Sequence, residues 1–285
     1  MQPQPGILAP LPAHARYVTL RWHGDDASAA LARFDGAEVG RSAVVGFGPG
    51  FLAAAERTVP GLSGFPSFPG AKVDLPSTPA AVWLWLRGDD PGSLLHEERG
   101  WLARAGAGFS VEASVAAFVH RGGRDLSGYE DGTENPTGDD ARRHGVVGEG
   151  PLRGSSFVAV QRWRHDFDAL EALGQPERDR TIGRRIADNE EIPDAPATAH
   201  VKRTAQEDFE PEAFVLRRSM PWADAGGAGL VFVAFGRSLD AFTAQLHRMC
   251  GAEDGVVDAL WRFTRPETGA TFWCPPAVGG SNLTT

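Results

Sequence analysis

Short runs of β-branched and aromatic residues, separated by stretches with helical periodicity, recur along the whole of this sequence. The apolar runs predict strands at residues 16–23, 42–48, 80–88, 109–120, 157–163 and 229–236. The periodic stretches predict helices at residues 27–34, 51–56, 91–106 and 238–249. Because strands and helices do not alternate one for one, the pattern favours antiparallel α+β layers over a doubly wound parallel sheet.

Two distant segments of the chain are similar to each other. VGFGPGFLAAAE, starting at Val45, and VAFGRSLDAFTA, starting at Val233, both predict a strand, a glycine turn and a helix with one apolar face. This similarity is consistent with an internal duplication. It is equally consistent with two unrelated strand-turn-helix units.

The length of the chain indicates more than one hydrophobic core. At 285 residues it exceeds the usual size of a single core, so we expect two domains, residues 1–135 and 136–285. Two segments rich in Gly, Pro and charge, residues 132–156 and 174–199, are predicted to be irregular. The first of them would carry the domain boundary.

Charge and hydropathy narrow the classes of partner. The net charge of −9 argues against nucleic acid and anionic membranes as partners, because both surfaces repel an acidic protein. The first twelve residues lack the basic start and apolar run of a secretory signal. No later stretch supplies the roughly 20 apolar residues of a membrane span. The sequence therefore predicts a cytoplasmic protein that binds neither nucleic acid nor membrane.

The cysteines and most histidines give little support to a metal site built from side chains alone. Two cysteines, Cys250 and Cys274, are too few for a disulfide scaffold or a thiolate cage. Eight histidines occur, but none forms an HExxH pair or a close His/Cys cluster, so zinc is poorly supported. His200, which ends a polar loop, is different: one inward-pointing imidazole suffices to bind haem, because the porphyrin supplies four more nitrogens.

Two further segments contain charged residues that catalysis uses. The string DLSGYEDGTENP, from Asp125, places Asp131 before Gly132 in a predicted turn that can project the carboxylate. The string VLRRSMPW places Arg217 and Arg218 at the end of a predicted strand. An isolated Asp-Gly turn and paired arginines are both typical of an ordinary surface. A buried arginine beside Asp131 would instead indicate a role in stabilising charge.

Five blocks of sequence, taken together, resemble one protein family. They are GYEDGTENP at Gly128, IGRRIADNEEI at Ile182, TAHVKRT at Thr198, VLRRSMP at Val215 and LWRFTRPETGATFWCPP at Leu260. In this order they are similar to the dye-decolourising (DyP-type) haem peroxidases, specifically the bacterial P class, formerly called class B. The resemblance extends from Asp125 to the end of the chain and is looser in the first half.

The resemblance implies a fold and a set of site residues. The fold would be two ferredoxin-like modules with antiparallel β-sheets, with haem b in the C-terminal module, and the internal duplication would then be expected. The roles are the following: His200 as the proximal iron ligand, Asp131 as the distal acid, Arg217 as the distal arginine, Ser219 where some relatives have asparagine, Arg184 near a haem propionate, Leu230 and Phe232 as the apolar distal wall, and Asp258 as the carboxylate that orients His200.

The resemblance also implies an activity. A haem b peroxidase of this kind would reduce hydrogen peroxide through a ferryl intermediate and would oxidise organic one-electron donors such as dyes and phenols. Asp131 would shuttle the peroxide proton, and Arg217 would stabilise negative charge on the departing oxygen. Relatives form oligomers, so a homo-oligomer is expected. The tail AVGGSNLTT lacks an apolar extension containing Leu or Ile, which argues against packaging in a protein nanocompartment.

Two other functions remain open from the sequence. A haem-handling protein that binds or releases haem or its iron without peroxidase turnover would need the same pocket and His200. A non-haem interaction module with an α+β fold is the third possibility. Replacement of Asp131 or Arg217 distinguishes the first two, and the colour of a His200→Ala variant tests the third.

Overall fold

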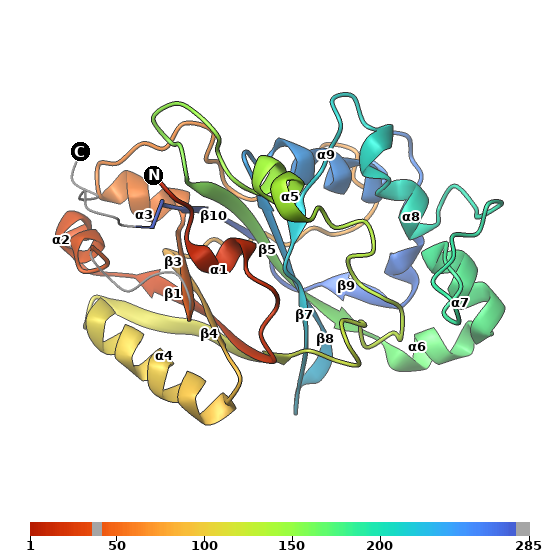
Figure 1. The fold of residues 1–285 in the computed structure, drawn as a ribbon, viewed down its shortest axis with the longest axis horizontal. Coiled ribbons are helices and arrows are strands. Elements are labelled where there is room, and N and C mark those ends of the chain that lie inside the picture. Colours follow the sequence, from red (N-terminus) through yellow and green to blue (C-terminus); the bar gives the residue numbers. More distant parts are fainter. Residues whose placement is uncertain (36–41, 278–285) are drawn as a thin grey trace.

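The computed structural model describes residues 1–35 and 42–277 (Figure 1). The C-terminal segment AVGGSNLTT, which argues against nanocompartment packaging, lies mainly outside the described residues. The elements, in chain order, are α1 (Pro5–Leu8), β1 (His14–Trp22), α2 (Ala27–Ala32), β2 (Ala43–Phe47), α3 (Pro49–Ala54), β3 (Val82–Gly88), α4 (Pro91–Ala105), β4 (Phe109–Phe118), α5 (Gly138–Gly145), β5 (Ser156–His165), α6 (Phe167–Ala172), α7 (Gly174–Ile182), α8 (His200–Arg203), the 3₁₀ turn η1 (Gln206–Asp208), β6 (Leu216–Arg217), β7 (Met220–Asp224), β8 (Gly227–Gly236), α9 (Asp240–Met249), the 3₁₀ turn η2 (Ala259–Arg262), β9 (Thr264–Pro266) and β10 (Ala270–Cys274).

The two halves of the chain repeat one topology. In the first half the strands lie in the order β4-β1-β3-β2, all antiparallel, which is the order of a ferredoxin-like βαββαβ unit. In the second half β10 pairs with β5, β5 with β8, and β8 with β7 and β6. Taking β6 and β7 together as the second strand, this is the same order again. The α+β class and the duplicated ferredoxin-like architecture are confirmed.

The two half-sheets join at both ends into a closed barrel. β10 pairs with β2 through Trp273 and Phe47, and β4 pairs with β7 through Ala117 and Trp222. Each junction brings together the fourth strand of one half and the second strand of the other. One continuous sheet therefore contains strands from both predicted domains, and the boundary between residues 135 and 136 stays a prediction.

The sequence similarity that suggested duplication does not join equivalent elements. The segment from Val45 forms β2 and α3, which hold the second-strand position of the first half. The segment from Val233 forms β8 and α9, which hold the third-strand position of the second half. The duplication is real, but these two segments are similar only because both are strand-turn-helix units.

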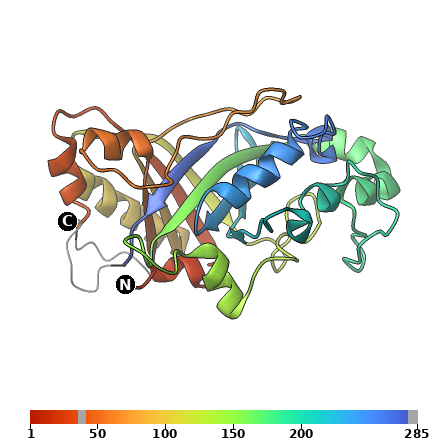
Figure 2. The same cartoon turned by 90° about the horizontal axis from the view of Figure 1, so that it is seen from above.

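Alternation along the strands separates a barrel interior from outer layers. On β3, Val82, Leu84 and Leu86 pack outward against the helices of the first half, whereas Trp83 and Trp85 point into the barrel. β5 and β8 alternate in the same way, with Val158 and Val231 inside the barrel. Figure 2 shows α9 lying along β5 on the outside of the barrel. The outer face of β5 and β8 in the second half also borders a cavity.

Two predicted irregular segments contain short helices. α5 lies within residues 132–156, and α7 lies at the start of residues 174–199. Both helices are short and polar, so their apolar periodicity is weak and the sequence hides them. The Asp26 carboxylate accepts a hydrogen bond from the backbone N–H of Ala29 and caps α2. Among the described residues, no helix has the length and apolarity needed to cross a bilayer.

Candidate active site

A cavity of about 510 Å³ lies on the outer face of β5 and β8, beneath α8 and α9. Its volume falls within the usual range of about 300–1,000 Å³ for cofactor and substrate sites. The strands line it with Gln161, Trp163 and His165 from β5 and with Leu230 and Phe232 from β8. Because side chains on a strand alternate, these are the residues that cannot point into the barrel. The predicted apolar-wall residues, Leu230 and Phe232, therefore both lie at this cavity.

His200 lies at the start of α8 and lines the cavity, with 22% of its side chain exposed. The polar loop that ends at His200 leads directly into this one-turn helix. The Nδ1 atom of His200 lies 2.7 Å from Oδ2 of the fully buried Asp258. The other ring nitrogen, Nε2, has no hydrogen-bond partner among the described residues and is available to a ligand.

Asp258 is itself held in place. Its Oδ1 accepts a hydrogen bond from the backbone N–H of Leu260 at 2.9 Å, which caps η2. The next residue, Ala259, donates its backbone N–H to the carbonyl of Thr198, at 2.8 Å, in the segment leading to His200. The carboxylate and the imidazole are thus joined by both side-chain and main-chain bonds. A carboxylate on Nδ1 fixes the tautomer of a metal-ligating histidine and leaves Nε2 to bind the metal.

Asp131 and Arg217 also line this cavity and form an ion pair across it. The distance from Nη1 of Arg217 to Oδ1 of Asp131 is 3.5 Å, and 22% and 21% of the respective side chains are exposed. The surface alternatives for the Asp-Gly turn and for Arg217 are therefore wrong. Burial raises the pKa of the Asp131 carboxyl, and the charge of Asp125 adds to that rise, while Arg217 and His200 oppose it.

The loop that carries Asp131 owes its shape to two glycines and an asparagine. Gly128 and Gly132 have φ of +96° and +83°, which L-residues rarely adopt. Asn135 then fastens the loop to β6, because its Oδ1 accepts from the N–H of Arg217 and its Nδ2 donates to the carbonyl of Arg217, both at 2.9 Å. This two-way bond brings the two charged side chains to the same cavity.

Arg184, the residue predicted to lie near a propionate, stands at the cavity with carboxylates already beside it. Its guanidinium donates to Glu134 at 2.8 Å and lies 3.7 Å from Glu191. Ser219 is buried, but the structure does not place it among the residues that line the cavity, and its hydroxyl accepts from the N–H of Val233 at 3.3 Å. The structure therefore brings the predicted site residues to one cavity, apart from Ser219 and Asp258. Asp258 does not line the cavity but bonds to His200.

Sequence reasoning missed several polar residues of the cavity. His165 and Asp125 form a buried pair at 3.0 Å. Gln161 is almost fully buried, and its Nε2 has no hydrogen-bond partner. A local signal for both β5 residues was present in the strand alternation: Gln161 and His165 are polar residues on the face of the strand opposite its buried valines.

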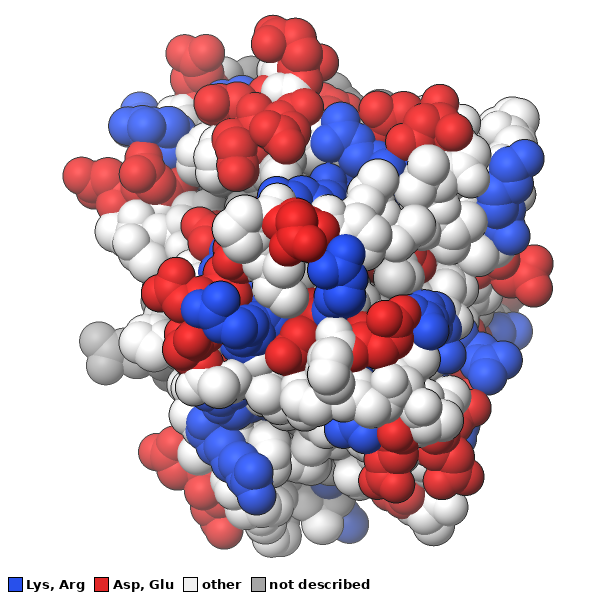
Figure 3. Space-filling view, turned by 90° about the vertical axis from the view of Figure 1, so that its right-hand side faces the viewer, with Lys and Arg blue, Asp and Glu red and all other residues white. Residues whose placement is uncertain are grey.

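The face of the molecule in Figure 3 carries interspersed acidic and basic side chains rather than one basic patch.

Comparison with known proteins identifies the family. A family model described as Dyp-type peroxidase, C-terminal, matches residues 122–279. The chain is 32% identical over 251 residues to a dye-decolorizing peroxidase of Rhodococcus erythropolis, covering 84% of this chain and 73% of that protein. It is 29% identical over 219 residues to a dye-decolorizing peroxidase of Mycobacterium tuberculosis, covering 74% of this chain but only 65% of that relative.

Solved structures agree over nearly the whole chain. DyPB from Rhodococcus jostii has a TM-score of 0.86 at 27% identity, with 96% of each chain covered. A dye-decolorizing protein from Vibrio cholerae has a TM-score of 0.86 at 27% identity, with 95% of this chain and 96% of that one covered. A variant of the Rhodococcus jostii protein was solved in complex with heme, with a TM-score of 0.86 and 26% identity. This chain belongs to the Dyp-type peroxidase family.

Proposed function

We propose that this chain is a haem b peroxidase that reduces hydrogen peroxide and oxidises small organic one-electron donors such as dyes and phenols. The observation that carries the proposal is that the Asp131–Arg217 pair lies in the same cavity as an imidazole whose Nδ1 is bound to a buried carboxylate. The family relatives, which bear the name peroxidase, support the same activity over the haem-handling alternative.

The residues of the cavity fit a haem. Among the residues that the structure describes, no three His, Cys, Asp or Glu side chains gather to hold a metal ion by themselves. A single imidazole with a free Nε2 is the donor set that haem requires. The surrounding wall is apolar, with Leu230, Phe232 and Leu246 among its residues. The unpartnered Nε2 of Gln161 supplies a hydrogen-bond donor beside them.

Residues from the second half of the chain would hold the haem. His200 would ligate the iron, and Asp258 would fix the imidazole. Arg184 would pair with a propionate in place of Glu134, whose side chain is 65% exposed, so that its present ion pair contributes little. When bound, haem supplies a redox-active iron that exchanges electrons with peroxide and with the donor.

Asp131 and Arg217 would perform the acid–base part of the reaction. A carboxylate whose pKa is raised by burial holds a proton more readily than an exposed one, so Asp131 would take a proton from one peroxide oxygen and return it to the other. The Arg217 guanidinium stabilises negative charge on the oxygen that leaves, and it does so more effectively in a partly buried site than in water. Both side chains are positioned before substrate arrives, because Asn135 ties their backbones together.

The test uses haem-loaded protein. Wild type should bind haem, show a Soret band and consume peroxide with a dye as donor. Asp131→Asn and Arg217→Leu should retain haem yet lose on the order of 100-fold or more of their turnover, as expected for a positioned proton-transfer group. Asp25→Asn, an exposed carboxylate outside the cavity, is the matched control and should behave as wild type. Full activity in both cavity variants would refute the proposal.

The same variants separate the other functions. In a haem-handling protein, replacement of Asp131 or Arg217 would change neither haem binding nor the low peroxide turnover. A non-haem interaction module would be colourless after haem addition, both as wild type and as His200→Ala.

Four finer expectations belong to the proposal. The haem is expected to be haem b, the location cytoplasmic and the assembly a homo-oligomer, and packaging in a nanocompartment is not expected. Extraction of the pigment, cell fractionation, light scattering of the purified protein and co-purification with a shell protein test them in turn.

A further inference from the structure

No described residue before Asp125 lines the cavity, so β1 to β4 and the segments between them add no side chain to it. The first half still reaches the helix that covers the cavity through residues 57–80, which we call the strap. The strap lies in the connection from α3 to β3 and contains neither helix nor strand. Irregular segments longer than about 12–15 residues are uncommon in compact proteins and are usually functional or disordered. Figure 2 shows the strap, in orange, reaching from the first half over the second.

The middle of the strap packs against α9, the helix above the cavity. The ring of Phe68 lies edge-on to the imidazole of His247, with 5.0 Å between the ring centroids. The backbone N–H of Lys72 donates to the carbonyl of Cys250 at 2.9 Å, one residue past the end of the helix. Neither strap residue lines the cavity, whereas Leu246 of the same helix does. α9 therefore touches the strap and the cavity through different residues.

Phe65 connects the strap to the cavity wall through one intermediate ring. Its ring centroid lies 5.8 Å from that of Phe242, which in turn lies 6.2 Å from that of Phe232. Phe242 and Phe232 line the cavity, and Phe65, which is only 8% exposed, does not. Protein interiors are close-packed, so a ring cannot shift without its neighbours. The position of Phe65 therefore restricts the two rings that face the cavity.

Gly269 lets the strap lie against the segment between β9 and β10. A Cβ at this position would lie 2.4 Å from the carbonyl oxygen of Pro76 and 2.6 Å from Cε1 of Phe65, closer than Cβ atoms approach other atoms. Thr78 fastens the same place in both directions. Its backbone N–H donates to the Gly269 carbonyl at 2.7 Å, and its hydroxyl accepts from the Gly269 N–H at 3.0 Å. Gly269 does not line the cavity, so a side chain at this position would displace the strap without touching the cavity.

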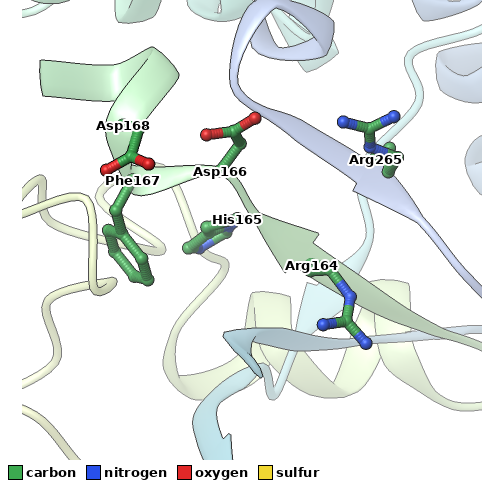
Figure 4. A pocket seen from close by; sticks show the side chains of 6 residues that line it. All are labelled: Arg164, His165, Asp166, Phe167, Asp168 and Arg265. Carbon is green, nitrogen blue, oxygen red and sulfur yellow. The ribbon is translucent and has the colours of Figure 1, made fainter. Parts of the chain in front are cut away.

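A second stretch of the cavity wall comes near the surface without the strap. Around the end of β5 there is a shallow hollow of about 390 Å³. Figure 4 shows the residues that line it, which are Arg164, His165, Asp166, Phe167, Asp168 and Arg265. His165 lines both the hollow and the cavity, and the ring of Phe167 packs edge-on against it, with 5.9 Å between the centroids. Phe167 is thus a ring behind the cavity wall that belongs to neither the strap nor α9, and it serves as a comparison for Phe65.

We propose, resting on the haem site proposed above, that the strap holds α9 and the rings of Phe242 and Phe232 in place and thereby slows the release of haem. Phe65 is a positioning residue in this arrangement, because it acts through Phe242 and does not itself line the cavity. A wall that is held before haem arrives needs less ordering when haem binds. A helix fastened at Phe242 and at Cys250 also has less freedom to move aside when haem leaves.

Haem release measures the effect of the strap directly. Haem-loaded protein is mixed with an excess of apomyoglobin, and the change in Soret absorbance gives the dissociation rate. Phe65→Ala should raise this rate on the order of 10-fold, within the range for coupling between residues in contact. Phe65→Leu, which keeps most of the buried volume, should restore most of the wild-type rate. Gly269→Ala, which displaces the strap from a point outside the cavity, should raise the rate as well.

Two further variants separate positioning from a general loss of stability. Phe34→Ala removes the same side chain from the core of the first half, where it packs against Phe47 and Trp101, and should leave the haem dissociation rate at the wild-type value. Phe242→Ala removes the intermediate ring, so in that background Phe65→Ala should raise the rate less than about twofold. An equal rise with Phe34→Ala and Phe65→Ala, or a full rise with Phe65→Ala in the Phe242→Ala background, would overturn the assignment of Phe65.

Hydrogen exchange tests the strap without haem. In the haem-free chain, the backbone amides of α9 should exchange faster in Phe65→Ala and Gly269→Ala than in wild type, while those of α4 should not change. Phe167→Ala should leave the exchange of α9 as in wild type. Equal exchange and equal haem release in Phe65→Ala and wild type would overturn the inference. If wild type bound no haem, the proposed function itself would fail, and the exchange rates alone would then decide whether the strap holds α9.

Discussion

The bond between Asp258 and His200 allows a quantitative prediction. In Asp258→Asn, one side-chain oxygen remains to serve two donors, the Leu260 N–H and the His200 Nδ1–H, and the amide NH₂ faces whichever donor is left. One hydrogen bond to a charged group is lost, which costs about 1.5–3 kcal/mol. Haem affinity should therefore fall about 10- to 100-fold, the range found when the outer partner of a metal-binding histidine is removed.

Haem titration followed at the Soret band measures the affinity, and a spectroelectrochemical titration measures the midpoint potential of the iron. The potential should rise, because a histidine without its carboxylate is a weaker donor to ferric iron. Glu253→Gln, which removes an exposed carboxylate in the preceding loop, should change neither quantity. Unchanged affinity together with an unchanged potential in Asp258→Asn would refute the assignment of His200 as the ligand.

Three further predictions concern pH, thiols and packing. The pKa of Asp125 is lowered, so this carboxylate stabilises the fold above pH 3.8, the ordinary pKa of Asp, and the stabilisation is lost as the pH falls. The pKa of Asp131 is raised, so ionisation of this carboxyl lowers the stability of the fold as the pH rises above 3.8. Urea unfolding should accordingly show Asp125→Asn less stable and Asp131→Asn more stable than wild type near neutral pH, and shifts of the same sign would contradict this reasoning. Burial raises the pKa of the thiols of Cys250 and Cys274, so iodoacetamide should label neither until the chain unfolds, and prompt labelling of the native protein would be the contrary result. Phe235→Ala, in the barrel interior, should lower the free energy of unfolding by about 3–5 kcal/mol, measured by urea denaturation; a loss below about 1 kcal/mol would mean that this interior is loosely packed.

Local pattern in the sequence predicted the elements whose apolar spacing is strong. The strands β3 and β8 and the helix α9 occupy nearly the predicted residues, because the strands are apolar on both faces and the helix on one. α7 was missed, since its residues GQPERDRTI are polar around the whole helix. β10 was also missed: its strand character appears only in its pairing with β2 and β5, which lie far away in the sequence.

Some residues of the candidate site could be identified from the sequence and others could not. The family motifs identified Asp131, Arg217 and His200, and the structure brings all three to one cavity. Asp125 and His165 stand 40 residues apart, and each alone is typical of an ordinary polar residue. Their relation depends on where β5 ends relative to the Asp131 loop. Such a relation is fixed by tertiary packing and has no local signal.

The junction that β10 makes between the two half-sheets has a consequence for folding during synthesis. β10, the last strand in the described part of the chain, lies between β2 and β5 and pairs with both. While the ribosome is still translating that region, the edges of β2 and β5 remain unpaired and open to other chains. Synthesis of the final strand therefore determines when the nascent protein stops being prone to edge-to-edge association, and truncation before Ala270 should leave an aggregating product.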